Sequence, residues 1–501
     1  MNQVTPIENL DDHSTLPSSN TWACEQNNAT NAYYVTLSSG QVNNNNKNNS
    51  YAVVPVAESC RLIDALFEAE EDCWKSKKSR QDAARFHFHL AEVFDLFKIL
   101  NNRSYQPTTS TCFVLTYPRY REVFAAKYRD RVVHHLVAPF VSKVTEAVHI
   151  TNGDISHGNR NGFSAQTAAE QIQLNMRRYP NGVVATMDVQ GFFMNINREV
   201  AYQIFVNAFN KYKPSGYSEQ DTEFMLWVLY QLIHHYPASD CVRNSPLCMW
   251  DKIPPEKTLF CNKGKGLPIG NFYSQLIANL VLSVWGRAVL DMGLECRVTQ
   301  FVDDMCIVAK DKHAIHKIRQ MSIELLEDMK LNIHPKKFYI QPTRHGVQFC
   351  GRVIYANRMY INNRTIRACK NSIKQATKAG ASLRNAEKLL NSFNSYMGFM
   401  CHTRSYKIQC ELASMVEQSD YKEYLYFKHK KGQVVCVMYE KYKPLPRHIE
   451  EIKELKTYYK QEVYGNDELL SNGRANWRTK KSYREQWSGC SLWIRRLRHW
   501  I

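Results

Sequence analysis

Hydrophobic and polar residues follow helical and strand-like periods through most of the chain from about residue 58 onwards. Residues 59–100 place apolar side chains three and four positions apart, which predicts two amphipathic helices. Residues 106–126 predict a strand pair that leads into a helix. The remaining pattern predicts a buried strand from 181, helices over 218–236, 313–331 and 364–416, a glycine-rich loop opening a long helix over 263–290, and a strand meander over 346–363. This mixture predicts an α+β fold.

The first 57 residues differ from the rest because they are polar and rich in asparagine. The run from Asn43 to Asn46, followed by Asn48 and Asn49, is typical of a loop or a disordered segment. Only the short piece YYVTL within this segment favours a strand.

Two adjacent carboxylates interrupt the apolar run RVTQFVDDMCIVAK at 297–310. The run predicts two short strands joined by a turn that presents Asp303 and Asp304. Burying unpaired carboxylates is costly, so a partner cation, a metal or exposure to water is expected. Asp188 ends the upstream strand VVATMD, and a third carboxylate there would complete a site for two divalent ions. A pair of aspartates in a turn is, however, usually solvent-facing.

The charge balance changes the expected partner. The chain has 501 residues with 65 basic and 47 acidic side chains, a net charge of +18 and a pI near 9.2, which favours a polyanion such as nucleic acid as the binding partner.

The 15 cysteines of the chain show no zinc-like spacing, which favours reduced thiols in the core. An acidic N-terminus without an apolar run predicts no signal peptide, and no membrane span is expected. A cytoplasmic location fits best.

Five motifs occur in an order and with a spacing that resemble reverse transcriptases. They are MDVQGFF, which contains Asp188, then GLPIGNFYSQ, FVDD, LNIHPKK and GVQFCGR, and the resemblance covers roughly residues 100–415. It implies a right-hand polymerase with fingers, a palm sheet backed by helices, and a helical thumb. It also implies RNA-directed DNA polymerase activity, a nucleotidyl transfer, with two Mg²⁺ ions and with Mn²⁺ as a possible substitute.

The resemblance divides the chain into segments. They are an Asn-rich segment at 1–57, N-terminal helices and fingers at 58–187, a palm at 188–361, a thumb at 362–418, and a basic, Trp-rich extension at 419–501.

Within reverse transcriptases, the chain most resembles the enzymes of diversity-generating retroelements. REVFAAKYRDRVVHHLV at 121–137 is similar to their first conserved block, and Ser274 and Gln275 after GLPIG are another of their marks. Group II intron enzymes usually carry Ala before the paired aspartates, where this chain has Val302. The resemblance therefore implies adenine-mutagenised cDNA, made from a template-repeat RNA to diversify a target gene.

The resemblance also implies roles for the carboxylates. Asp188 and Asp303 correspond to ligands of the two metal ions, and Asp304 belongs to the same turn. The backbone carbonyl of Val189 corresponds to a further ligand.

Other residues correspond to substrate contacts. Phe193 matches an aromatic gate that excludes a ribose 2′-hydroxyl, whereas neighbouring Phe192 is expected in the core. Arg160 in GNRNGFSAQ resembles a fingers residue that contacts the triphosphate, and an exposed loop arginine is the alternative. Lys337 resembles the lysine that protonates pyrophosphate, with Lys336 competing for the role.

The GLPIG motif and GVQFCGR complete the expected substrate site. Ile269 stands where many reverse transcriptases have Gln beside the nascent base pair, and it is followed by Gly270. An apolar side chain makes none of the hydrogen bonds of Gln, which implies looser discrimination between pairs. GVQFCGR is similar to the hairpin that grips the primer 3′ end.

Two terminal segments and the partners follow from the same resemblance. Asparagine codons are rich in adenine, so residues 1–57 are expected to overlap a template repeat or to form an ordinary linker. The Trp-rich tail is expected either to bind RNA or to dock on the body. The implied partners are template-repeat RNA, cDNA, deoxynucleoside triphosphates and a small basic accessory oligomer. The rival functions are a phage-defence or intron-like reverse transcriptase and a non-catalytic RNA-binding scaffold.

Overall fold

The computed structural model describes residues 56–78, 80–116 and 119–442, together with three short strands nearer the N-terminus. The chain divides into two compact units. Of the described residues, the first unit holds those up to Thr108 and 127–137, and the second holds 109–126 and 138–442. Among the helices of this described part, none is long and apolar enough to cross a membrane.

The Asn-rich segment contains an antiparallel sheet where disorder was one expectation. Its strands are β1 (Thr21–Gln26), β2 (Asn31–Thr36) and β3 (Gln41–Asn46). Strand β2 contains the YYVT sequence whose aromatic and β-branched residues favour a strand, and β3 pairs along its whole length with β2. Whether the segment derives from a template repeat stays a prediction.

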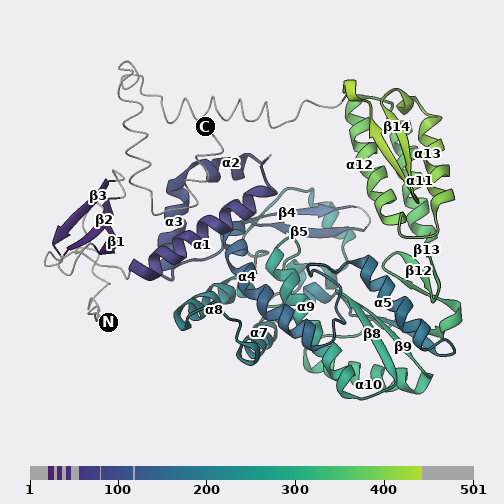
Figure 1. Ribbon diagram of the computed structural model, residues 1–501, viewed down its shortest axis with the longest axis horizontal. Coiled ribbons are helices and arrows are strands. Elements are labelled where there is room, and N and C mark those ends of the chain that lie inside the picture. The colour runs from purple at the N-terminus through teal and green to yellow at the C-terminus, as the bar shows by residue number, and fades with distance from the viewer. Residues whose placement is uncertain are drawn as a thin grey trace. The chain divides into compact units, whose positions relative to one another are not determined.

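Helices form the rest of the first unit, where two amphipathic helices were expected and three are found. They are α1 (Val56–Lys75), α2 (Gln81–Phe88) and α3 (Leu90–Asn101) (Figure 1). They enclose the carboxylate of Glu70, which is fully buried. The Tyr128 hydroxyl donates to Glu70 at 3.1 Å, and His87 Nδ1 lies 2.9 Å from the same oxygen. Tyr128 begins α4 (Tyr128–Thr151), so this contact ties the start of α4 to α1.

A four-stranded antiparallel sheet forms the centre of the second unit. Its order is β10–β6–β9–β8, made of β6 (Val183–Asp188), β8 (Cys296–Phe301), β9 (Asp304–Ala309) and β10 (Tyr339–Pro342). Three helices pack on it, namely α5 (Ala165–Arg178), α9 (Phe272–Asp291) and α10 (Lys312–Asp328) (Figure 1). Trp285 of α9 is fully buried and donates to Ser322 of α10 at 2.8 Å. This is the palm that the sequence predicted.

A smaller sheet carries the fingers strands of the second unit. Its order is β5–β4–β7, made of β4 (Ser110–Leu115), β5 (Arg121–Ala125) and β7 (Cys241–Arg243). Helices α6 (Phe192–Asn195), α7 (Arg198–Tyr212) and α8 (Glu219–His234) follow the first palm strand. Buried Glu122 of β5 accepts hydrogen bonds from Thr258, at 2.7 Å, and from Trp250, at 3.1 Å. These bonds hold the short 3-10 helices η2 (Leu247–Lys252), η3 (Pro255–Lys257) and η4 (Leu259–Cys261) against the fingers strands.

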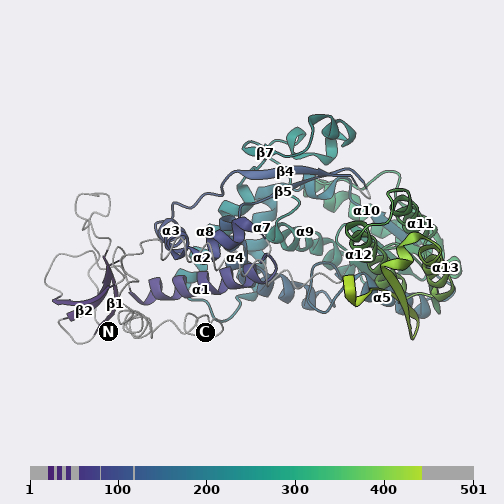
Figure 2. The same cartoon turned by 90° about the horizontal axis from the view of Figure 1, so that it is seen from above.

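A strand meander leads from the palm into the thumb. It consists of β11 (Val347–Phe349), β12 (Arg352–Tyr355) and β13 (Arg358–Ile361). The thumb helices are α11 (Asn363–Lys378), α12 (Leu383–Met400) and α13 (Tyr406–Glu417), which lie together in Figure 2.

The thumb core continues beyond the boundary at 418 that was expected from the sequence. The hairpin β14 (Leu425–Lys430) and β15 (Gln433–Met438) packs its apolar side chains against α12 and α13. Its alternating pattern buries Val434, Cys436 and Met438 on one face, so these residues need the helices to cover them. The four tail tryptophans lie outside the described residues.

Candidate active site

Two carboxylates face each other across the central strands of the palm. Asp188 at the end of β6 pairs in register with Asp304 at the start of β9. Side chains alternate along a strand, so this pair lies on the same sheet face as Thr186 and Cys306, the pair two positions away. Like charges directly opposite each other destabilise a sheet unless a cation lies between them. The sequence predicted that Asp188 and Asp304 converge, and the sheet register brings them together.

A tight turn carries the third carboxylate. Strands β8 and β9 are joined through Val302 and Asp303, with Phe301 paired to Asp304 across the turn. Val302 has φ +57°, a left-handed conformation that a β-branched residue rarely adopts. Gly158 packs against this turn so closely that a Cβ there would lie 2.8 Å from Val302 Cγ2. The conformation of the turn therefore depends on its neighbours.

The electrostatic setting disfavours negative charge on both turn carboxylates. Burial raises the pKa of Asp303, which the Arg121 guanidinium partly offsets. Burial and the adjacent Asp303 charge raise the pKa of Asp304 to about 6, against an opposing effect of Arg119. A divalent cation placed here would supply the missing positive charge.

The LNIHPKK segment is bonded to the backbone around Asp188. The His334 N–H donates to the Asp188 carbonyl and the Gln190 N–H donates to the Asn332 carbonyl, both at 2.8 Å. These two bonds bridge Val189 to Ile333 without using the Val189 carbonyl. The predicted backbone ligand therefore remains outside the bridge, next to Asp188.

The same turn separates the two candidate lysines. Lys337 Nζ forms an ion pair with Asp188 Oδ2, and its side chain is 43% exposed. Lys336 donates its backbone N–H to His334 Nδ1 at 3.2 Å, and its side chain is exposed. Partial burial and the Arg119 charge lower the pKa of Lys337. The geometry thus brings Lys337 to the carboxylates.

The donor set fits a hard, oxygen-preferring cation, although it is not arranged as a preformed cage. Within the described part of the chain, no group of three His, Cys, Asp or Glu residues is clustered closely enough to hold a metal ion. The two facing carboxylates, the turn carboxylate of Asp303 and the Val189 carbonyl are nonetheless all oxygen donors, which suits Mg²⁺ or Mn²⁺. In this structure, the Lys337 ammonium provides the positive charge beside Asp188.

A cavity of about 680 Å³ opens in front of this group. Asp188, Asp304 and Lys337 line one end of it. Gln348, Phe349, Cys350, Val353 and Tyr355 of the GVQFCGR hairpin line the rest, with others from β6 and β10. The hairpin expected to hold the primer end therefore borders the cavity that contains the carboxylates.

Phe192 and Phe193 take different positions. Phe192 is 2% exposed and belongs to the core, as expected. Phe193 is only partly buried and meets Phe192 edge to face, with ring centroids 5.7 Å apart. The Leu267 N–H donates to the Phe193 carbonyl at 2.7 Å, which ties this residue to the GLPIG loop. Of the two rings, Phe193 is the more exposed.

The GLPIG loop lies against the fingers strand β5. The Phe124 N–H donates to the Ile269 carbonyl at 2.8 Å, and the partly buried Ile269 side chain packs on a cluster that includes Phe124. Gly270 has φ +121°, and a Cβ there would lie 2.5 Å from the Phe124 carbonyl oxygen, so glycine is required. Gln275 is half-buried in the first turn of α9.

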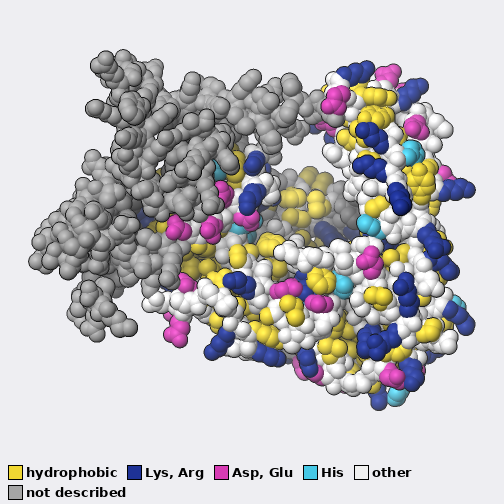
Figure 3. Space-filling view, viewed as in Figure 1, with side chains coloured by type: hydrophobic (Ala, Val, Ile, Leu, Met, Phe, Trp, Pro, Cys, Tyr) yellow, Lys and Arg dark blue, Asp and Glu magenta, His cyan; other side chains and the backbone are white. Residues whose placement is uncertain are grey.

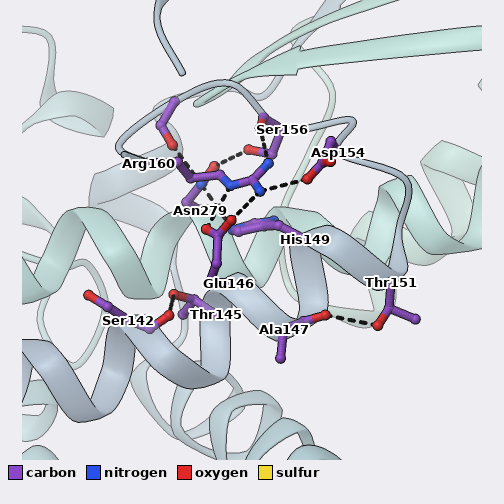
Figure 4. A network of polar contacts seen from close by, with 11 residues as sticks. Ser142, Thr145, Glu146, Ala147, His149, Thr151, Asp154, Ser156, Arg160 and Asn279 are labelled. Atoms are coloured by element: carbon purple, nitrogen blue, oxygen red, sulfur yellow. Dashed lines mark hydrogen bonds and ion pairs between the residues drawn. The ribbon is translucent and has the colours of Figure 1, made fainter. Parts of the chain in front are cut away.

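Arg160 lies in a network of polar contacts, as Figure 4 shows. Its side chain is 3% exposed and forms ion pairs with Glu146, at 2.5 Å, and Asp154, at 2.7 Å. It also donates to the Ser156 carbonyl at 2.7 Å and covers the Phe163 ring at 3.9 Å. With these partners the guanidinium is bound to the loop that carries it, so Arg160 is not an exposed loop arginine, and its contact with the triphosphate stays a prediction.

Two other arginines, which the sequence analysis did not single out, act electrostatically on the carboxylates. Arg119 lies just before β5 and Arg121 begins it; both are exposed, and their charges lower the pKa of Asp304 and Asp303 respectively. The signal for them was the basic sequence PRYR between the two predicted fingers strands.

A palm sheet that presents paired aspartates beside a lysine, below a fingers hairpin, defines the class of template-directed nucleotidyl-transfer polymerases with a right-hand fold. Residues 119–354 match the family model "Reverse transcriptase (RNA-dependent DNA polymerase)". The chain therefore contains a reverse transcriptase domain, which confirms this part of the sequence prediction.

Solved structures with a similar fold include two fungal telomerases. Apo telomerase from Candida tropicalis, truncated from its C-terminal domain, is 9% identical with a TM-score of 0.40, over 51% of this chain and 55% of that chain. Telomerase from Candida albicans, in complex with a fragment of telomeric RNA, is 12% identical with a TM-score of 0.38, over 64% of this chain and 56% of that chain. The chain thus spans little more than half the length of these proteins. No curated protein matches it in sequence.

Proposed function

We propose that this protein is an RNA-directed DNA polymerase whose active centre is the cavity at Asp188 and Asp304. The observation that carries the proposal is the in-register pairing of these two carboxylates, with Lys337 beside them, inside the reverse transcriptase domain. Two negative groups facing each other at a sheet position are costly unless they serve to bind cations.

The residues supply distinct parts of nucleotide addition. Asp188, Asp303, Asp304 and the Val189 carbonyl would hold two Mg²⁺ ions, and these ions would supply activation of the primer 3′-hydroxyl and stabilisation of charge on the leaving group. Lys337 donates a proton to the pyrophosphate oxygen that leaves. Positioning and charge stabilisation provide most of the rate enhancement in phosphoryl transfer, so these groups suffice for the chemistry.

The substrate is selected by residues around this centre. Arg119 and Arg121 bind the triphosphate, because their exposed guanidinium groups already act on the carboxylates. Phe193, the more exposed of the two rings, lies beside the sugar of the incoming nucleotide and excludes a 2′-hydroxyl.

A chain of cavities supports binding of a primer–template duplex. The cavity at the carboxylates shares Gln348, Val353 and Tyr355 with a second of about 670 Å³, which in turn shares Arg364 and Arg367 with a third of about 660 Å³ on the thumb. Arg404 and several amide side chains of the thumb complete the lining. Figure 3 shows further Lys and Arg side chains over the thumb helices, and such side chains neutralise backbone phosphates.

The finer function we propose is that of a diversity-generating retroelement. The polymerase makes adenine-mutagenised cDNA from a template-repeat RNA in the cytoplasm, with a small basic accessory oligomer as partner. Ile269 supports this assignment because its backbone is fixed to β5 and its apolar side chain is partly buried beside the fingers. Such a side chain offers no hydrogen bond to a nascent base pair, which favours misinsertion.

Primer extension on RNA transcribed from the 5′ region of this protein's own gene tests the proposal. The reaction contains Mg²⁺ and all four deoxynucleotides, with and without the accessory protein, and the cDNA is sequenced. Asp303→Asn removes one site charge at constant size. Asp291→Asn, a matched control, removes an exposed carboxylate at the end of α9 that pairs with Arg287.

The expected result is cDNA from the wild-type and Asp291→Asn proteins and none from Asp303→Asn. Errors concentrated opposite template adenine support the retroelement assignment. Evenly faithful cDNA contradicts it and assigns the protein to a phage-defence or intron-like system. RNA binding without any extension, even with the accessory protein, contradicts the polymerase and leaves a scaffold.

A further inference from the structure

A buried polar network lies behind the turn that carries the catalytic aspartates. Its centre is Asn279 of α9, whose side chain is 1% exposed. Asn279 Oδ1 accepts from the Ser156 hydroxyl at 2.7 Å, and Nδ2 donates to the Gly158 carbonyl at 2.8 Å (Figure 4). Asn279 Nδ2 also lies 3.2 Å from His149 Nε2. One amide therefore joins the palm helix α9 to two points of the loop before α5.

His149 acts in this network as a neutral acceptor. Burial, with a further contribution from the Arg160 charge, lowers the pKa of His149 to about 4. Its ring is therefore uncharged near pH 7, and Nε2 accepts the Asn279 hydrogen bond. The loop itself is closed by the ion pairs of Arg160 with Glu146 and Asp154.

Gln300 connects this network to the aspartate turn. It is fully buried at the end of β8, and its Nε2 donates to the Val302 carbonyl at 3.0 Å and lies 3.4 Å from Asn279 Oδ1. Its backbone is bonded on both sides to the same loop, to the Ile155 carbonyl and the His157 N–H, each at 2.9 Å. Both acceptors around Nε2 are oxygens, which fixes the orientation of the amide.

The turn needs such support because of its backbone. A left-handed conformation at a residue other than glycine is energetically unfavourable and persists only when the surroundings enforce it. Gln300 holds the Val302 carbonyl from one side, and Gly158 fills the space against Val302 from the other. Asp303 follows Val302 directly, so the direction of its carboxylate depends on this peptide.

We infer that Gln300 and Asn279 are positioning residues, which hold the Val302–Asp303 turn so that its carboxylates are arranged for divalent metal ions. The inference rests on the proposed function, but it concerns metal binding by the protein itself. Neither side chain touches the substrate cavity. They act through the Val302 carbonyl and through the loop that carries Gly158.

Direct Mn²⁺ binding to the full-length protein, measured by electron paramagnetic resonance without nucleic acid, tests the inference. Gln300→Met keeps the length of the side chain and removes the donor to Val302. Gln409→Met is the matched control, because Gln409 is also fully buried and donates to a backbone carbonyl, that of Gly432, in the thumb. Asp303→Ala defines the signal lost when a ligand is removed.

Gln300→Met is expected to weaken Mn²⁺ affinity and to lower kcat by about 10- to 100-fold, the usual effect of losing a hydrogen bond behind a metal ligand. The KM for primer–template should stay unchanged. Asn279→Leu should show a smaller effect, and the double variant should lose less than the product of the two single losses, because both act on one turn. Gln409→Met should retain Mn²⁺ affinity.

Two outcomes overturn the inference. In the first, Gln300→Met shows the same Mn²⁺ affinity and the same kcat as the wild-type protein after correction for the folded fraction. Gln300 would then have a purely structural role. The other is an equal loss of affinity in Gln409→Met. Failure of the polymerase proposal is recognised separately, because the wild-type protein would then bind Mn²⁺ through Asp303 but make no cDNA.

Discussion

Replacing Arg160 separates a structural role from a substrate role. Arg160→Met keeps a long side chain over Phe163 but removes the guanidinium and its hydrogen bonds to Glu146, Asp154 and Ser156. Because the side chain is buried, we expect the variant to lose stability. Because the group does not reach the cavity, we expect the KM for deoxynucleotides to stay the same in the folded fraction.

The size of the effect follows from the contacts. A hydrogen bond to a charged group contributes about 1.5–3 kcal/mol. The side chains of Glu146 and Asp154 are 41% and 48% exposed, so water can hydrogen-bond to both carboxylates when the arginine is removed. Losing these two bonds therefore costs only part of their full contribution to stability. The Ser156 carbonyl loses its donor in a region that stays largely buried. The net loss should be about 2–4 kcal/mol, below the 3–5 kcal/mol typical of a fully buried pair.

Urea unfolding followed by fluorescence, with hydrogen exchange of residues 146–160, measures the loss. Arg287→Met is the matched control, since it breaks an exposed pair with Asp291 and should leave the free energy of unfolding nearly unchanged. Steady-state kinetics at saturating primer–template give the KM for deoxynucleotides. Unchanged stability together with a raised KM in Arg160→Met would refute the structural assignment and restore the triphosphate contact.

Three further residues have expected outcomes. Asp304→Asn should stabilise the metal-free protein by about 1–3 kcal/mol at pH 8 and by little at pH 4, as measured by urea unfolding. The reason is that folding raises the pKa of Asp304 from 3.8 to about 6. The stability of the wild-type protein therefore falls as the pH rises through that range. An unchanged difference between the two pH values would contradict this. Lys337→Met should lower kcat by about 10²–10⁴-fold with little change in the KM for deoxynucleotides in rapid-quench assays, and a change in KM alone would exclude the proton donor. Phe193→Ala should permit ribonucleotide incorporation, detected as alkali-labile cDNA, whereas Phe192→Ala should mainly destabilise the core.

Much of the fold could be predicted from the sequence because its helices and strands have strong local sequence patterns. The apolar periods predicted the palm strands around the DD pair and the long helices after the GLPIG loop, and the structure confirms them. The hydrophobic run of α9 is buried on nearly all sides, so little but a core helix is compatible with it. Local signals were weaker at the N-terminus, where three strands occur in a segment expected to include disorder.

The C-terminal boundary of the thumb could not be predicted from the sequence in the same way. The hairpin of β14 and β15 is short, and its alternation shows only that one face is buried. The partners that bury this face are the earlier helices α12 and α13, and no pattern within the hairpin identifies them. The segment was therefore assigned to an extension, while the structure includes its hairpin in the thumb core.

Residue types and motif order determined the chemistry of the site, and the fold decided which side chains take part. The carboxylates could be named from the sequence because the five motifs around them resemble the reverse transcriptase series, whereas a pair of aspartates in a turn is by itself usually solvent-facing. Arg160 and Arg121 could not be ranked from the sequence, because each is an arginine whose anionic partner is not evident from its neighbours in the chain. The fold pairs Arg160 with Glu146 and Asp154, which lie 14 and 6 residues earlier in the chain, and it brings the charge of Arg121 to act on Asp303 from a distant segment. An arginine binds whichever anion the fold brings within reach.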